Sequence, residues 1–421
     1  MKRTRSPILW TLRATALLAG AVLVVSCNDT SAPVLRYPLL DEVGTSDWQT
    51  VSAGAAHTCA LKTDGTAYCW GSNQYGQLGS TATDTICAIA ADTTYTCANR
   101  PKAVTTSLKF RSISAGQKHT CAITTALEAY CWGGNDQGQL GSTGSDGPTL
   151  RPVPTTLPWT QISAGYAHTC AVRSDGALYC WGQNDRGQLG SAATTGTSTP
   201  LRVNISTAVA SVTTAQGRTC ARTTAGVSYC FGSIWLVRLD GAELTRSQTS
   251  PQLVPKAPTM ASLSIGSFTS CGIDVNGLVY CWEANQRGQI GDGTIQGDTV
   301  PTRVATDMQF VQISAGIIQT CGVTTAGVGY CWGDHSFGEL GVPSAQIVQR
   351  CGAIAAPCSL LPVAVLGRQT FTEISTGLGS HTCGVTTKGN LYCWGLGTSG
   401  QRGDSTIRGS VTTPLAVAQS K

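Results

Sequence analysis

The chain has 421 residues, of which 41% are hydrophobic and only 12% are charged, so it has enough apolar side chains for a core and is not a disordered polymer. Four of its 28 basic residues lie in the first 27 positions, which contain no acid, and the remaining 24 are balanced by 23 acids. A near-neutral chain without a basic cluster lacks the charge that nucleic-acid binding requires, and we expect no nucleic-acid partner.

Residues 1–27 have the three parts of an export signal: a basic start, an apolar run at 14–25, and a small-residue end at Ser26 and Cys27. The run is short for a permanent membrane helix. The sequence VVSC at 24–27 resembles the lipobox of bacterial lipoproteins, which implies lipidation of Cys27 and an exported location, lipid-anchored in the bacterial cell envelope (periplasm or cell surface). An ordinary signal peptide or an uncleaved anchor is the alternative. Residues 28–46 are predicted to form a tether.

A repeat of about 50 residues occupies the rest of the chain. Each unit contains two cysteines ten positions apart, and the first cysteines of successive units are separated by 62, 49, 50, 51, 50 and 62 residues. A period near 50 built from short β-rich segments is typical of a propeller or a related array. The seven pairs are Cys59 with Cys69, Cys121 with Cys131, Cys170 with Cys180, Cys220 with Cys230, Cys271 with Cys281, Cys321 with Cys331, and Cys383 with Cys393.

Each unit contains the elements of one blade. In the first unit, strands are predicted at 49–54, 57–61 and 67–71, followed by a glycine-bounded corner, GQLG, and a proline-led strand at 101–104. Asp64 lies midway between Cys59 and Cys69, so a hairpin turning there places the two cysteines opposite each other. Four strands per unit are the composition of a propeller blade.

The repeated pattern SAGxxHTCAxxxxGxxYCWGxNxxGQLG resembles the repeat of the regulator of chromosome condensation family. The resemblance implies an all-β fold, a seven-bladed β-propeller with four short antiparallel strands per blade, over residues 47–421. The strand near 413–417 has no unit after it. We therefore expect it to pair with the first blade and close the ring.

The cysteines divide evenly. Beyond the seven blade pairs and Cys27, the remaining four form two pairs, Cys87 with Cys97 and Cys351 with Cys358. The family pattern does not require cysteine at the blade positions, and even numbers in an exported chain favour nine disulfides. Buried free thiols are the alternative. No cysteine or histidine spacing fits a metal site, and we expect no metal.

Four of the five histidines occupy one slot, two positions before the first cysteine of a unit. A ring of ligands around the central channel is one interpretation; a buried hydrogen-bonding residue is the favoured one. The fifth, His335, is predicted to lie in a surface loop. The sequence contains no catalytic motif, so we expect no cofactor and favour a protein that is not an enzyme. The four that share the slot are His57, His119, His168 and His381.

Two insertions, residues 80–100 and 342–361, interrupt the link between the corner and the last strand of the first and sixth units. In a closed ring they emerge on one face and flank the seventh unit, where they form a predicted partner-binding surface; neutral surface insertions are the alternative. The fourth unit, which lacks the GQLG corner at 231–241, is the next candidate. The predicted contact residues are Asp92, Tyr95, Arg100, Gln349 and Arg350.

The favoured function is a monomeric, lipid-anchored binding or scaffold propeller outside the cytoplasm, which recognises a protein or an envelope polymer through loops on its face. The membrane is contacted through the N-terminal lipid alone. By family analogy the alternative is a regulator of nucleotide exchange on a GTPase, although export would separate it from cytosolic GTPases. A further alternative is an extracytoplasmic hydrolase or lyase with a site assembled on one propeller face.

Overall fold

The computed structural model describes residues 46–83, 85–90, 93–237, 243–407 and 409–418. The predicted export signal, Cys27, almost all of the predicted tether and Asp92 lie outside the described residues. Among the described residues, no helix combines the length and apolar character needed to cross a membrane. The regular structure of the described chain is β-strand, and η1 (Ser344–Gln346) is its one assigned helical turn.

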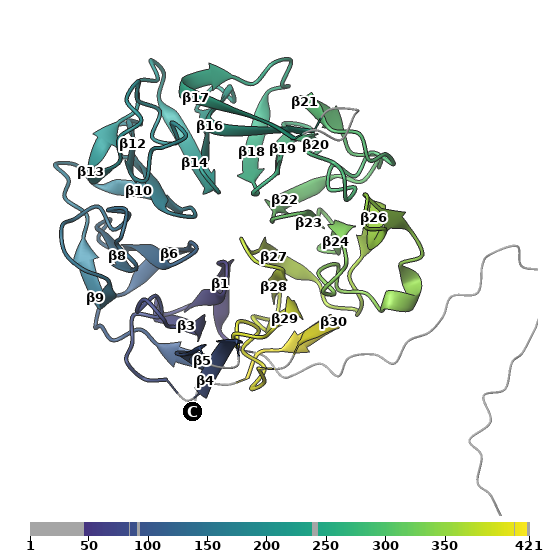
Figure 1. Cartoon of the computed structure of the whole chain (residues 1–421), viewed down its shortest axis with the longest axis horizontal. Coiled ribbons are helices and arrows are strands. Elements are labelled where there is room, and N and C mark those ends of the chain that lie inside the picture. The colour runs from purple at the N-terminus through teal and green to yellow at the C-terminus, as the bar shows by residue number, and fades with distance from the viewer. Residues whose placement is uncertain (1–45, 84, 91–92, 238–242, 408, 419–421) are drawn as a thin grey trace, which may run out of the picture. The chain divides into compact units, whose positions relative to one another are not determined.

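Seven antiparallel sheets are arranged around a central axis, each made from one repeat unit, as predicted (Figure 1). Blades 2, 3, 4, 5 and 7 have four strands each. Blade 2 contains β6 (Phe110–Ala115), β7 (His119–Thr124), β8 (Ala129–Gly133) and β9 (Gly147–Pro152), and blade 3 contains β10 (Trp159–Ala164), β11 (His168–Arg173), β12 (Leu178–Gly182) and β13 (Thr197–Arg202). Blade 4 contains β14 (Val209–Ala215), β15 (Arg218–Thr223), β16 (Ser228–Val237) and β17 (Glu243–Leu253), and blade 5 contains β18 (Met260–Ile265), β19 (Thr269–Asp274), β20 (Val279–Glu283) and β21 (Asp298–Arg303). Blade 7 contains β27 (Phe371–Thr376), β28 (His381–Thr386), β29 (Leu391–Leu396) and β30 (Ser410–Ala416).

Blades 1 and 6 have a fifth strand, because each carries one of the two insertions. Blade 1 contains β1 (Trp48–Ala53), β2 (His57–Lys62), β3 (Ala67–Ser72), β4 (Thr85–Ala90) and β5 (Thr93–Ala103). Blade 6 contains β22 (Phe310–Ala315), β23 (Gln319–Thr324), β24 (Gly329–Asp334), β25 (Arg350–Cys351) and β26 (Ala356–Ala364). The insertions therefore extend existing blades and add no separate domain.

The position of a strand in its blade explains its sequence. The first strand, such as β1, alternates buried and exposed side chains, whereas the second, such as β7, is buried along its whole length. A second strand is covered on both faces by neighbouring blades, which is why HTCAIT has no polar-out alternation. The apolar cores accordingly lie between blades rather than within one sheet.

Ring closure differs from the prediction. The C-terminal strand β30 pairs with β29 and completes blade 7, so it does not pair with the first blade. The repeat unit read from the sequence, which begins at the first strand and ends at the proline-led strand, is already one whole blade, and no strand is left to exchange. Blades 7 and 1 are joined by other bonds: Thr50 Oγ1 donates to Glu373 Oε2 at 2.7 Å, and the Val51 amide donates to the same oxygen at 3.2 Å.

The paired cysteines face each other across the central hairpin of every blade, with Cα–Cα distances of 4.0–4.1 Å. The disulfides of blades 1 to 7 join, in order, Cys59 to Cys69, Cys121 to Cys131, Cys170 to Cys180, Cys220 to Cys230, Cys271 to Cys281, Cys321 to Cys331, and Cys383 to Cys393. In each hairpin the two cysteines are directly opposite in the strand register, as the spacing about a short turn predicts.

The insertions contain the remaining two disulfides, which join Cys87 to Cys97 and Cys351 to Cys358. The nine pairs are those expected from the sequence, and the alternative of buried free thiols does not describe this structure. Each disulfide links residues of a single blade, so among the described residues no disulfide crosses from one blade to the next.

Neighbouring blades are joined by the GQLG corner. The carbonyl of Gln139 in blade 2 accepts a hydrogen bond from Trp181 Nε1 at 2.9 Å and another from Thr169 Oγ1 at 2.8 Å, both in blade 3. The same pair of donors meets the corner carbonyl of Gln77, Gln289, Glu339 and Gln401 at four other junctions. We call this arrangement the corner latch.

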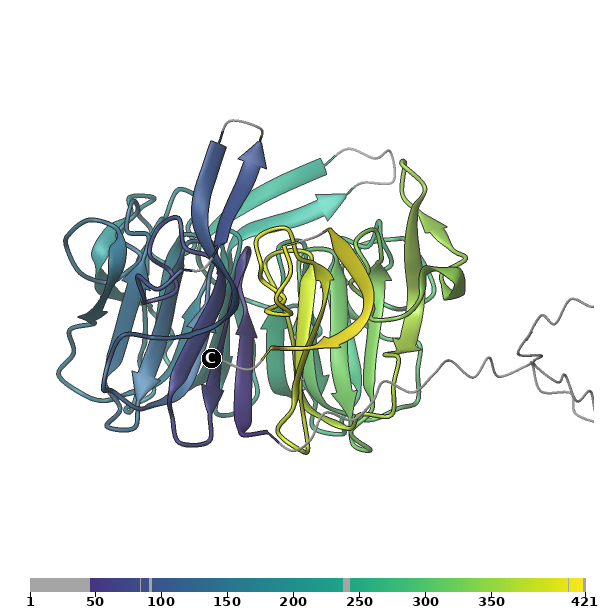
Figure 2. The ribbon, with the colours of Figure 1, turned by 90° about the horizontal axis from the view of Figure 1, so that it is seen from below.

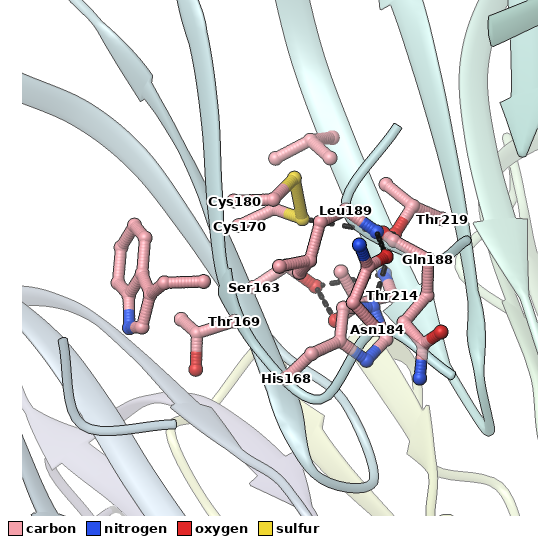
Figure 3. Close-up of a disulfide and its surroundings, with 12 residues drawn as sticks. Ser163, His168, Thr169, Cys170, Cys180, Asn184, Gln188, Leu189, Thr214 and Thr219 are labelled. Atoms are coloured by element: carbon pink, nitrogen blue, oxygen red, sulfur yellow. Dashed lines mark hydrogen bonds between the residues drawn. A yellow bond between two sulfur atoms is a disulfide. The ribbon is translucent and has the colours of Figure 1, made fainter. Parts of the chain in front are cut away.

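The slot histidines add a further hydrogen bond at the blade junctions. In Figure 3, His168 Nε2 lies 3.0 Å from Thr219 Oγ1, whose own proton goes to the Gln188 carbonyl. Because the threonine has one proton and has given it away, the imidazole must donate from Nε2. His57, His119 and His381 make the same contact with the next blade. The favoured interpretation of the histidine slot therefore agrees with the structure.

Removing the latch donor should reveal its contribution. Trp132→Phe keeps an aromatic ring but removes the N–H that binds the Gln77 carbonyl, and we expect the free energy of unfolding to fall by about 1 kcal/mol beyond the cost of the lost indole volume. Trp282→Phe is the matched control, because Trp282 has no hydrogen-bond partner among the described residues and should lose much less. Equal losses in denaturant titrations with the disulfides intact would contradict the latch.

Candidate functional site

Both insertions rise from the same face of the disk, and they lie on either side of blade 7 (Figures 1 and 2). In blade 1 the hairpin of β4 and β5 stands above the disk; in blade 6 the projecting element is η1 with β25 and β26. Equivalent positions in equivalent blades must emerge on one side, which explains the shared face. We call these two elements the blade 1 insertion and the blade 6 insertion.

The blade 1 insertion is bound to blade 7. Tyr95 Oη lies 2.7 Å from Ser399 Oγ, and Asn99 Nδ2 donates to the Ser405 carbonyl at 3.1 Å. The half-buried Tyr95 thus serves an intramolecular contact, which its position in a predicted exposed surface did not suggest. Arg100 is also half-buried, whereas Ile86 is 68% exposed.

The blade 6 insertion is bound to the corner of blade 5. Arg287 Nη1 donates to the Cys351 carbonyl at 2.8 Å, and Gln349 Oε1 accepts the Leu360 amide at 3.0 Å. Arg350 is exposed and donates to carbonyls of its own loop. The insertion also exposes two apolar side chains, Val348 at 83% and Ile354 at 76%.

The predicted contact residues are therefore divided. Gln349 and Arg350 are exposed on the blade 6 insertion, while Tyr95 and Arg100 are partly covered on the blade 1 insertion. The contacts of Tyr95 reach blade 7, and those of Arg350 stay within its own loop. The exposed apolar residues of both insertions were absent from the prediction, although Ile86 and Val348 are visible as apolar letters in polar segments.

The buried ionisable groups support structure rather than catalysis. Burial lowers the pKa of His57, His119 and His381 to about 3 and that of His168 to about 4, so these rings are neutral. Each leaves its Nδ1 without a partner, which a second ring proton would make costly. Within the described chain, no three histidine, cysteine or acidic side chains form a group that could hold a metal.

His335 is not a surface-loop residue. It is 2% exposed, and its Nδ1 accepts the Leu340 amide at 3.4 Å. Asn73 makes the equivalent bond to Leu78 in blade 1, so His335 replaces the asparagine that shapes the corner. The register of the repeat, WGDH against WGSN, carries this information in the sequence.

Between blades 4 and 5 the described residues form no latch. In place of a corner, β16 continues into a long hairpin with β17, which leans over blade 5 (Figures 1 and 2). Arg218 stands in the histidine slot and forms a buried ion pair with Glu283, while its Nη2 donates to Ser270 Oγ at 2.6 Å. Burial raises the pKa of Glu283 to about 7, against the opposing effect of Arg218. A cavity of about 280 Å³ remains beside Trp282.

Comparison with known families agrees with this architecture. A family described as "RCC1-like domain" matches residues 98–421, and the regulator of chromosome condensation (RCC1) repeat matches residues 48–77 and 64–123. The chain belongs to the RCC1-like family. In this chain each of the seven blades contains a disulfide across its central hairpin.

Individual relatives match in parts. The ultraviolet-B receptor UVR8 of Arabidopsis thaliana is 30% identical over 102 residues, or 24% of this chain, and the probable E3 ubiquitin-protein ligase HERC6 of Homo sapiens is 36% identical over 93 residues, or 22%. The matches span only 21% and 8% of those proteins. Among solved structures, Prp20p of Saccharomyces cerevisiae superposes with a TM-score of 0.72 at 19% identity, covering 89% of this chain and 88% of that one. Human WBSCR16 superposes with a TM-score of 0.68 at 18% identity, covering 82% and 88%.

The neutral histidines predict a specific dependence on pH. The His119 pKa falls from 6.5 to about 3 on folding, so between these values protons bind the unfolded chain and destabilise the folded one. His119→Gln uses the residue already present at position 319 of the same slot. We expect the variant to be less stable than the wild type at pH 7.5, and the gap to shrink by up to about 1.4 kcal/mol per pH unit below pH 6.5.

The measurement is denaturant unfolding of both chains from pH 7.5 to 4.5. Other titrating groups cancel in the difference. Ser114→Ala removes a nearby acceptor, the one bound by the Ala164 amide at 2.9 Å, without removing a titratable group, so its effect should stay constant with pH. A constant gap for His119→Gln would show that this histidine titrates normally.

Proposed function

We propose that the protein is an exported, lipid-anchored binding propeller whose partner, a protein or an envelope polymer, docks on the face that carries the blade 1 and blade 6 insertions. One observation carries the proposal: two disulfide-closed elements rise from the same face on either side of a single blade. A loop held by its own disulfide loses little conformational freedom when a partner binds, so such loops favour recognition.

The exposed chemistry of these insertions supports contact with another macromolecule. Ile86, Val348 and Ile354 are large apolar side chains left largely open to solvent, and Arg350 supplies a positive charge beside them. Interfaces commonly combine apolar anchors with arginine. Both insertions are also fastened to rigid blades, through Ser399 and Arg287, which limits the freedom lost on docking.

Related propellers also support recognition of macromolecules. The Prp20p structure was described together with its binding to Gsp1p and histones, and the same yeast protein was solved with Kap60 bound. These partners belong to that protein, and 18–19% identity transfers the fold alone. For this chain the comparison supports a rigid disk as a platform for protein binding.

Export and anchoring rest on the N-terminal sequence and on the cysteines. The lipobox-like residues 24–27 follow an apolar run, and the paired cysteines of the propeller form nine disulfides, a number suited to an oxidising compartment. Lipidation at Cys27 would hold the propeller near a membrane and leave its faces free for binding.

Shortening both insertions should separate binding from folding. Each segment, 80–100 and 342–361, is cut to the link of about ten residues found in the other blades, which removes both cysteines of its pair. We expect capture of the partner, crosslinked from an envelope extract by the wild-type protein, to fall by about tenfold or more. Circular dichroism and thermal unfolding report whether the propeller remains folded.

A matched control shortens the β16–β17 hairpin of blade 4 instead. That hairpin is distant in sequence and does not flank blade 7. It should leave capture unchanged if the insertions form the site. Capture that survives loss of both insertions, in a folded variant, places the partner elsewhere and overturns the proposal.

The anchor is tested separately by Cys27→Ser. Without the thiol no lipid can be attached at residue 27. Because stable anchoring depends on the acyl chains, the protein should leave the membrane fraction or accumulate as a longer precursor. Fractionation and mass spectrometry of the mature N-terminus give the result, with the double variant Cys87→Ser and Cys97→Ser as a cysteine-loss control that stays anchored. A variant processed and partitioned like the wild type would rule out lipidation at Cys27.

A further inference from the structure

The six corners of the propeller show what normally fills a blade junction. Their third residue is buried completely or almost so, and in five of the six it is aliphatic. The fourth residue is a glycine that lies against the tryptophan of the next blade, or against Phe231 in blade 4: a Cβ at Gly79, Gly141 or Gly291 would come within 2.7–2.9 Å of the indole nitrogen. The third residues are Leu78, Leu140, Leu189, Ile290, Leu340 and Arg402.

Trp282 is not packed against such a corner. Blade 4 has no corner, so the indole of Trp282 meets neither a carbonyl acceptor nor a glycine from the preceding blade, and its Nε1 has no hydrogen-bond partner among the described residues. The space beside it is the 280 Å³ cavity. One wall comes from blade 4, with Ile234, Leu253 and Val254, and the other from blade 5, with Trp282 and Thr299. The junction retains an indole placed for a corner that this chain does not supply.

Glu283 shows which part of the missing corner is already replaced. It has a φ of 86°, at the position that is glycine in every other blade. At Gly133 and Gly232 a Cβ would lie 2.6 and 2.3 Å from a backbone carbonyl of its own blade and 3.1–3.2 Å from the Cα of the preceding corner glutamine, so a side chain would also crowd the corner that blade 4 lacks. Glu283, bound by Arg218, takes up the glutamine's room. The space beside Trp282, which an aliphatic residue and a glycine would fill in another junction, stays open.

We propose that this cavity binds a turn of another polypeptide that presents an aliphatic residue followed by glycine. The aliphatic side chain lies against Ile234 and Val254, a backbone carbonyl accepts the Trp282 N–H, and the glycine allows close approach to the indole. This occupant follows from the rest of the molecule, because an aliphatic residue followed by glycine fills five other junctions. The site is separate from the two insertions, so it stands or falls independently of the function proposed above.

The test uses the full chain, with its tryptophan indoles labelled with ¹⁵N, and a synthetic peptide of residues 183–192, QNDRGQLGSA, which contains the corner of blade 3. The resonance of Trp282 is assigned by its loss in Trp282→Phe. We expect the peptide to shift this indole signal saturably, while the other indole signals stay in place. A control peptide with aspartate in place of the leucine should not shift it, because aspartate lacks the aliphatic side chain that would lie against Ile234 and Val254.

Two protein variants make the result specific. Val254→Trp fills the cavity and should abolish the shift, and Trp181→Phe, which alters a latched junction, should leave it unchanged. Peptide affinity measured by calorimetry should fall about fivefold in Trp282→Phe, the loss of one hydrogen bond. No shift at millimolar peptide, an equal shift with the aspartate peptide, or an unchanged shift in Val254→Trp would each overturn the proposal.

Discussion

The ring depends on one repeated interaction: the carbonyl of a corner residue in one blade accepts hydrogen bonds from a tryptophan and a threonine of the next. Three separate parts of the repeat contribute to these hydrogen bonds. GQLG holds the carbonyl in place, YCWG of the next blade supplies the indole, and HTC of the next blade supplies the hydroxyl, which accepts from the histidine of the blade that carries the corner. A buried carbonyl with two partners is well satisfied, and a buried threonine that both donates and accepts cannot turn away. The sequence repeats because the junction repeats.

Much of the blade could be predicted from the sequence, for local reasons. Cys59 and Cys69 are ten residues apart about a short turn, so a hairpin alone brings them together, and the strand order follows from the same spacing. The contacts of Thr169 could not be predicted in this way, because its partners Gln139 and His119 lie 30 and 50 residues earlier in another blade. Ring closure was wrong for a related reason. The boundary of a unit decides whether the last strand belongs to its own blade or to the first one.

The candidate sites were visible only as departures from the repeat. Residues 80–100 and 342–361 are longer than their counterparts, which predicts their location but not the exposure of Ile86 or Val348. At the fourth junction the departures are Arg218 for histidine and Glu283 for glycine, more than sixty positions apart in the sequence. Only the folded structure shows that these two residues form an ion pair. Their ion pair neutralises a carboxylate that is buried at a position held by glycine in the other blades.

The placement of the disulfides explains how one junction can remain open. Every disulfide of the described chain lies within a blade, so it makes that blade rigid. The faces of neighbouring blades are held together by packing and hydrogen bonds. A missing latch therefore weakens one junction without unravelling a blade, and Arg218 with Glu283 partly compensates there. Blades 7 and 1 share no strand, but unlike blades 4 and 5 they are joined by a latch and by additional hydrogen bonds. Trp70 is latched to Gln401, Glu373 binds β1, and Tyr95 reaches across to Ser399. The blade 1 insertion thus fastens the ring at the sector where it also stands exposed, and shortening it should test whether these two roles can be separated.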